Sequence, residues 1–284
     1  MTRRLLALAL ACAVLVCLLY VFFVRTDLGQ RIDDAALDGR ADLSASEVED
    51  ADDLLQTISL TSVALLGGAL VVVGAVRGGL SLAAASVIVL LGANVTTQLM
   101  KEVLARPDFV PSQAQVGLGN SLPSGHTTVA ASIALAAVLV APKRIRGPVA
   151  LLGALYAAVI GVAVLTAGWH RPSDAVAAFA MATGWAAVAS LVAIKRPKDR
   201  VELESQATVV SPLLLTLGAL FCALSFAVLV VALTALRLDR LDTIDFGRAY
   251  TAATVAIVGT AFLLTGALLF ALRPDREPAA AAVP

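Results

Sequence analysis

The sequence predicts an all-α fold, a polytopic transmembrane helix bundle. Hydrophobic residues make up 59% of the 284 residues and charged residues only 15%, which is more apolar surface than one soluble core can bury. Apolar runs close to the ~20 residues that cross a bilayer recur along the whole chain. The formal net charge is zero, so composition gives no reason to expect a nucleic-acid partner.

Eight apolar runs are the expected membrane spans. In chain order they are Leu5–Val24, Leu54–Val76, Leu80–Met100, Thr127–Ala141, Val149–Ala167, Ala175–Ile194, Pro212–Leu236 and Tyr250–Leu272. The fourth run is short, and we expect its helix to extend back to Ser124. The first run follows Arg3 and Arg4 but continues past a signal-peptide core without a clean cleavage site, so we interpret it as an uncleaved anchor.

The placement of Lys and Arg residues predicts the orientation of the bundle. With the N-terminus inside, the basic clusters at 143–146 and 195–200 both fall on the cytoplasmic side, as the positive-inside rule favours. Both termini are then cytoplasmic. Residues 27–53 hold ten Asp or Glu residues and lie outside, where we expect a solvated loop with at most a short helix. The Ala-rich tail after Glu277 is expected to be disordered.

Three polar clusters interrupt the apolar pattern, and this topology places all of them on the outer face. Their sequences are KEVLARP from Lys101, NSLPSGHTT from Asn120 and GWHRPSD from Gly168. Both histidines of the chain lie in these clusters, and ionisable groups near membrane depth are costly and usually functional. The sequence thus predicts that one outer site uses all three clusters.

The residue types in these clusters suit a phosphoryl group. Fixed positive charge comes from Lys101, Arg106 and Arg171, and arginine matches phosphate oxygens with two parallel hydrogen bonds. Ser124 and Gly125 precede a helix, whose N-terminus is a natural seat for phosphate.

The two histidines differ in their expected surroundings. If Pro172 opens a helix, Asp174 lies in its first turn and can orient the His170 ring as a nucleophile. His126 has no such partner in its cluster and is the free histidine of the two. The three cysteines fall in apolar runs, and no spacing predicts a metal site, a disulfide or another cofactor.

The pattern resembles the phosphatidic acid phosphatase type 2 superfamily over roughly residues 55–195. The middle motif, Pro123-Ser124-Gly125-His126, matches as it stands, and the third motif matches at His170 and Asp174. The resemblance implies a six-helix phosphatase core that includes the first anchor, and it leaves the last two spans as additions. The expected division is an anchor and acidic loop over 1–53, the phosphatase core over 54–195, and two further helices with the tail over 196–284.

The resemblance also implies a role for each site residue. His170 attacks phosphorus and becomes a phosphohistidine, Asp174 orients it, and His126 protonates the leaving oxygen. Lys101, Ser124, Gly125 and an arginine bind the phosphoryl oxygens, and no metal is needed. The substrate implied is a lipid phosphomonoester or a polyprenyl phosphate or diphosphate such as undecaprenyl diphosphate. We expect its hydrolysis at the extracytoplasmic face of the cell membrane. The composition, rich in Ala, Val, Leu and Arg, suggests a bacterial protein.

Two departures from the family pattern concern arginine. Only four residues separate Lys101 from Arg106-Pro107, where the family usually has six. The family's Ser-Arg pair before the nucleophile is replaced by Ala163 and Val164, and Arg171 is our candidate substitute. A phosphotransferase with the same intermediate, or a non-catalytic lipid-binding or transport protein with a degenerate site, stays open as an alternative. A homodimer also stays open.

Overall fold

The computed structural model describes residues 1–109, 119–194, 209–237 and 246–274, and these residues form helices joined by turns. The elements are α1 (Thr2–Leu19), the π-helical turn η1 (Tyr20–Val24), α2 (Asp27–Asp38), the 3₁₀ turn η2 (Gly39–Asp42), α3 (Ala45–Gln56), α4 (Leu60–Val103), α5 (Gly125–Val140), α6 (Arg146–Thr166), α7 (Pro172–Ala193), α9 (Val210–Arg237) and α10 (Phe246–Ala271). The predicted helical bundle is confirmed.

The long helices are apolar enough to cross a membrane. In the described part of the chain, six helices meet the length and hydropathy that a span requires, and α5 is a shorter apolar helix beside them. Within a bilayer a helix satisfies its own backbone polar groups, which is why such segments are helical. The chain is therefore a multi-pass membrane protein, and α5 begins at Gly125 with Ser124 as its N-cap, as expected.

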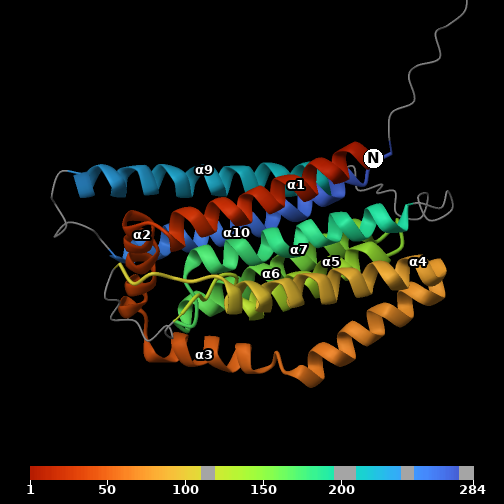
Figure 1. Ribbon diagram of the computed structural model, residues 1–284, viewed down its shortest axis with the longest axis horizontal. Coiled ribbons are helices and arrows are strands. Elements are labelled where there is room, and N and C mark those ends of the chain that lie inside the picture. The colour runs from red at the N-terminus through yellow and green to blue at the C-terminus, as the bar shows by residue number, and fades with distance from the viewer. Residues whose placement is uncertain (110–118, 195–208, 238–245, 275–284) are drawn as a thin grey trace, which may run out of the picture.

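Helix α4 is a hairpin of two membrane passes. Its 44 residues would span about 66 Å as one straight helix, roughly twice the ~30 Å hydrocarbon core. The chain reverses at Gly79, whose φ of 66° lies in the left-handed region that glycine adopts freely. The two arms then pack closely: a β-carbon added at Gly74 would meet the backbone of Ala83 at 3.0 Å. Figure 1 shows the two arms of the hairpin. They correspond to the runs predicted at 54–76 and 80–100, but the first arm begins at Leu60, because Leu54 and Leu55 lie at the end of α3.

Helix α7 lies at the centre of the bundle and packs against α1, α4, α5 and α10 (Figure 1). Its buried positions are largely alanine, and small side chains let neighbouring helices approach closely. Gly184 shows this approach, since an added β-carbon would lie 3.2 Å from the Cβ of Cys12 in α1. The N-terminal anchor is thus packed on the centre of the fold.

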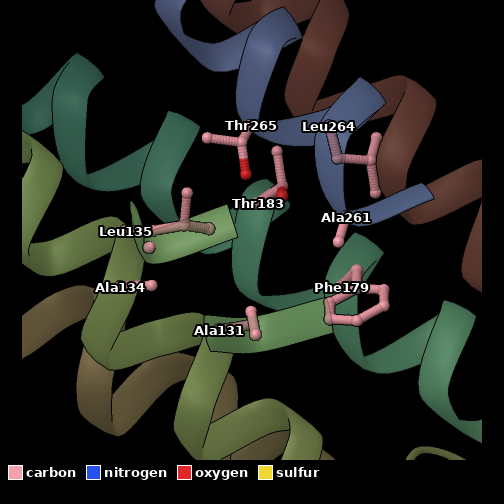
Figure 2. Close-up of a pocket in the computed structure, with 10 residues that line it drawn as sticks. Ala131, Ala134, Leu135, Phe179, Thr183, Ala261, Leu264 and Thr265 are labelled. Atoms are coloured by element: carbon pink, nitrogen blue, oxygen red, sulfur yellow. The ribbon is translucent and has the colours of Figure 1, made fainter. Parts of the chain in front are cut away.

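The last helix is also part of the core. Helix α10 packs against α6 and α7, whereas α9 packs mainly against α10. A cavity of about 10 Å³ lies where α10 meets α5 and α7. Figure 2 shows Ala261 and Thr265 of α10, Leu135 of α5 and Phe179 of α7 lining it. This volume holds at most one water molecule, so the cavity is a packing gap and not a substrate site.

The acidic segment differs most from expectation. Residues 27–53 were predicted to be a solvated loop, but they form α2, η2 and α3. That prediction is wrong for Asp33 and Asp34, which are only 1% and 4% exposed. Their carboxylates are buried because they find hydrogen-bond partners at the start of α7, as described below. The basic cluster at 195–200 and the tail after Glu277 lie outside the described residues.

Candidate active site

The three polar clusters meet at one end of the bundle, opposite the N-terminus of the chain (Figure 1). The second and third clusters are joined directly, because the backbone N–H of Ser124 donates to the carbonyl oxygen of Asp174 at 2.9 Å. The first cluster is equally near, since a β-carbon added at Gly125 would lie 3.6 Å from Nζ of Lys101. Residues far apart in the sequence therefore surround one small volume.

His170 is held by the first turn of α7. Pro172 opens this helix, and Asp174 lies at its third position, as the sequence predicted. Oδ2 of Asp174 lies 3.0 Å from Nδ1 of His170 and also accepts the backbone N–H of Arg171 at 3.2 Å. Because Asp174 is fully buried, its carboxylate fixes the ring with Nδ1–H toward it. In that neutral form of the ring, Nε2 carries a lone pair and no proton.

The loop that carries His170 is also held by hydrogen bonds to the last turn of α6. Helix α6 ends at Thr166, and Gly168, two residues later, turns the chain with a φ of 75° in the left-handed region. The backbone N–H groups of Trp169 and His170 both donate to the carbonyl oxygen of Val164, at 3.0 and 3.1 Å. Val164 occupies the position where the family usually carries arginine, and here its side chain is fully buried. That position supplies backbone support and no positive charge.

His126 lies in the first turn of α5 and faces the same volume. Ser124 caps this helix, its Oγ accepting the backbone N–H of Thr127 at 3.4 Å. The His126 ring stands edge-on to Trp169 with ring centroids 5.1 Å apart. His126 is close enough to His170 and Lys101 to interact electrostatically with both. No carboxylate bonds its ring in the described part of the chain, so it differs from His170 in the way expected.

Arg106 is the cation most clearly available to a ligand. Both terminal nitrogens of its guanidinium are buried and have no hydrogen-bond partner among the described residues. Burial lowers the pKa of Arg106, and the positive charge of Arg171 lowers it further, while Asp33, Asp174 and Asp34 oppose the shift. An unpartnered buried cation is costly, and an anion between Arg106 and the nearby histidines would offset that cost.

Arg171 is placed differently from Arg106. Its Nε donates to Oδ1 of Asp34 in a buried ion pair, with 2.5 Å between the two atoms. Arg171 lies near the site, but part of its guanidinium is committed to this carboxylate. Its predicted role as the substitute phosphate ligand stays a prediction.

Sequence reasoning missed the residues of α2 that reach this site. Asp33 accepts the backbone N–H of Ser173 at 3.1 Å and its hydroxyl at 2.5 Å. Gln30 donates to the carbonyl oxygen of Pro107 at 2.6 Å. One signal in the sequence could have found them. Lys101, Arg106 and Arg171 are three cations, and Asp174 was the only acid assigned near them, so further carboxylates were to be expected. Residues 27–53 are the acid-rich segment predicted on the same face.

No group of three His, Cys, Asp or Glu side chains that could hold a metal ion occurs among the described residues. Comparison with protein families gave a match to the PAP2 superfamily over residues 78–198. This range contains Lys101, Arg106 and both histidines. Neither the curated proteins nor the solved structures gave a match.

Proposed function

We propose that the protein is a membrane lipid phosphatase acting through a phosphohistidine, because residues 78–198 match the PAP2 superfamily, whose members are generally phosphatases. The proposed substrate is a lipid phosphomonoester or a polyprenyl phosphate or diphosphate, hydrolysed at the extracytoplasmic face. The distribution of Lys and Arg supports that orientation, with both termini cytoplasmic.

One observation carries the proposal: the buried contact of 3.0 Å between Nδ1 of His170 and Oδ2 of Asp174. It fixes the His170 ring through Nδ1 and leaves Nε2 without that partner, and His126 is near enough to His170 and Lys101 to interact electrostatically with both. An oriented imidazole with a free lone pair is a nucleophile, and a second imidazole nearby can carry protons.

The proposed reaction has two steps. In the first, the Nε2 lone pair of His170 forms a bond to phosphorus while the bond from phosphorus to the lipid oxygen breaks. Protonated His126 gives its proton to that leaving oxygen. In the second step, neutral His126 takes a proton from water, the hydroxide oxygen bonds to phosphorus, and the P–N bond breaks. Inorganic phosphate leaves, and both histidines return to their starting states.

The phosphoryl oxygens would lie among the cations and the start of α5. Lys101 projects beside Gly125, and the terminal nitrogens of Arg106 supply two parallel donors. The Ser124 hydroxyl, although it accepts one hydrogen bond, still has its own proton to donate. Because charge on the equatorial oxygens grows in the transition state, these fixed donors would stabilise it.

An apolar groove supports a lipid substrate. A cavity of about 570 Å³ lies between α1, the second arm of α4 and α7, within the size range of ligand sites. Its lining includes Tyr20, Met100 and Leu104, which are adjacent in the chain or in space to Lys101 and Arg106. The Tyr20 hydroxyl donates to the carbonyl oxygen of Ala105 at 2.9 Å. A lipid tail in this groove would place its phosphate at the cations.

The test is a phosphate-release assay on the purified full chain in detergent, with a panel of phosphatidic acid, phosphatidylglycerol phosphate, and polyprenyl mono- and diphosphates. The parent protein should release phosphate from at least one lipid, and His170→Ala should abolish release. Release that persists in His170→Ala rules out the assigned nucleophile. Product that forms only when an alcohol acceptor is added identifies a phosphotransferase, and no turnover of any lipid supports a non-catalytic protein.

A further inference from the structure

Helix α2 turns a polar face toward the interior, which is unusual for a short acidic helix. Gln30, Asp33 and Asp34 are three and four residues apart and so share one face. All three are buried, and Leu37 continues the same face one turn later. Asp27 and Arg31 of the same helix are exposed and form an ion pair. Burying an amide and two carboxylates is costly unless each one makes specific contacts.

The two carboxylates contact the third motif. Asp33 accepts hydrogen bonds from both the backbone N–H and the hydroxyl of Ser173. Ser173 lies in the first turn of α7, so Asp33 satisfies a backbone donor at the start of that helix. Asp34 pairs with Arg171, the residue that follows His170. Arg40, two residues beyond α2, continues this contact, since an added β-carbon at Gly168 would meet its guanidinium. The acidic segment therefore touches the His170 loop on both sides of the nucleophile.

The amide of Gln30 contacts the first motif. Its Nε2 donates to the carbonyl oxygen of Pro107, and its Oε1 accepts the backbone N–H of Phe109 at 3.3 Å. These hydrogen bonds hold the segment that directly follows Arg106. The same Nε2 donates to the carbonyl oxygen of Val24 at 2.9 Å, which ties the loop to the end of the first helix.

The helix itself is fixed at both ends by close backbone approaches. A β-carbon added at Gly29 would lie 2.0 Å from the carbonyl oxygen of Phe22, and one added at Gly39 would lie 1.9 Å from that of Phe246. Only glycine allows these approaches. Helix α2 therefore lies between η1 and the start of α10, and its position is set by helices on both sides.

We propose that α2 is a positioning element of the active site, in which Gln30, Asp33 and Asp34 hold Arg106 at a set distance from His170. The inference rests on the proposed function. The two residues come from separate loops, and side chains of α2 hydrogen-bond the neighbours of each one. Gln30 bonds Pro107, which follows Arg106, and Asp34 bonds Arg171, which follows His170. Misplacement of a catalytic group by about 1 Å can cost on the order of 100-fold in rate, so such a bridge matters for catalysis.

The test compares Asp34→Asn, Asp33→Asn and Gln30→Ala with a matched control, Asp27→Asn. The control removes the same charge as Asp34→Asn from the same helix, but on its exposed face. For the best lipid substrate, the three inward variants should lower kcat by about 10-fold to 100-fold. KM should rise by a smaller factor, and Asp27→Asn should match the parent in both constants.

A merely structural role would give a different pattern. It would lower the unfolding temperature of the inward variants in detergent and leave kcat of the folded fraction unchanged, and that result would overturn the proposal. A second readout is the double variant Asp34→Asn with Arg171→Gln. If Asp34 acts through Arg171, the double variant should lose no more activity than the worse single variant, whereas multiplied losses would contradict that link.

The failure of this inference is distinguishable from failure of the proposed function. An active parent with inactive His170→Ala supports the function, so unchanged kcat in all three inward variants overturns the positioning role alone. If no lipid phosphate is turned over, binding of inorganic phosphate, measured by ³¹P NMR titration, replaces the kinetic readout. Asp34→Asn should then bind phosphate more weakly than Asp27→Asn, and equal affinities overturn the proposal.

Discussion

Buried arginines lie at both ends of the bundle, but their donors are used differently. At the end near the N-terminus, Arg146 is 1% exposed and donates to the carbonyl oxygens of Val138, Leu139 and Ala141, which close the C-terminus of α5. Arg77 donates to the carbonyl oxygen of Val140 beside it. At the opposite end, the terminal nitrogens of Arg106 have no partner among the described residues.

The difference separates a structural arginine from a ligand-binding one. A guanidinium whose donors all reach helix carbonyls offsets its burial cost within the fold. A guanidinium with unused donors keeps part of that cost until an anion arrives. The same residue type therefore stabilises the fold at one end and, in our proposal, binds the phosphoryl group at the other.

The largest expected effect is that of Arg106→Ala on turnover. Loss of one fixed donor to transition-state oxygens typically costs about 100-fold to 1,000-fold in kcat, so phosphate release should fall by that range. The unfolding temperature should stay the same or rise, because an unpartnered buried charge is removed. Steady-state kinetics and thermal unfolding in detergent check the two halves. Near-parental kcat would remove Arg106 from the site.

Arg146→Met should show the opposite pattern. Buried polar groups left without a partner cost about 1–3 kcal/mol each, and several α5 carbonyls lose their donor in this variant. The unfolding temperature should therefore drop, while kcat of the protein that remains folded should match the parent. A large loss of kcat without loss of stability would contradict the contrast between the two ends.

Asp33 should make the stability of the outer end depend on pH. Burial raises the pKa of Asp33 to about 7, helped by the negative charge of Asp174 and opposed by Ser173 and Arg171. The unfolded value is near 3.9, so between about pH 4 and 7 the folded state binds the extra proton. The Asp33 contribution therefore falls as pH rises through that window. Unfolding temperatures across this range should decline less steeply for Asp33→Asn, and identical slopes would contradict the assignment.

The smallest expected effect is at the turn of the α4 hairpin. A side chain at Gly79, with φ of 66°, costs roughly 1–2 kcal/mol, so Gly79→Ala should lower the unfolding temperature slightly. Gly68→Ala is the matched control, because that glycine is helical and has open space around it. A control that destabilises as much as Gly79→Ala would remove the special role of the turn. Neither change should alter kcat.

Much of the fold could be predicted from the sequence, because membrane spans are long and apolar. Such runs can be found from their length and composition alone, without a helical periodicity of apolar residues. The His170 and Asp174 pair could be predicted as well, since Pro172 marks a helix start and the four-residue spacing lies within one turn. The reversal at Gly79 could be inferred only as a break between two runs. In each case the information is local to the segment.

The burial of Asp33 and Asp34 could not be predicted in the same way. The local sequence of an acidic helix does not show whether its carboxylates face water or the start of another helix. The partners of these two residues, Ser173 and Arg171, lie far away in sequence. The different states of Arg106 and Arg171 follow from the same tertiary contacts. Local pattern thus predicted the candidate site residues, whereas packing decides which of their cations has no partner among the described residues.

Trapping the covalent intermediate would test the proposed phosphohistidine mechanism most directly. The parent protein is mixed with a ³²P-labelled lipid phosphate, quenched in alkali and digested, because phosphohistidine survives alkali and hydrolyses in acid. Label should be found on the peptide that contains His170, should be lost in mild acid, and should be absent from His170→Ala. Steady phosphate release with no labelled protein, or with label on another residue, would contradict the proposed mechanism.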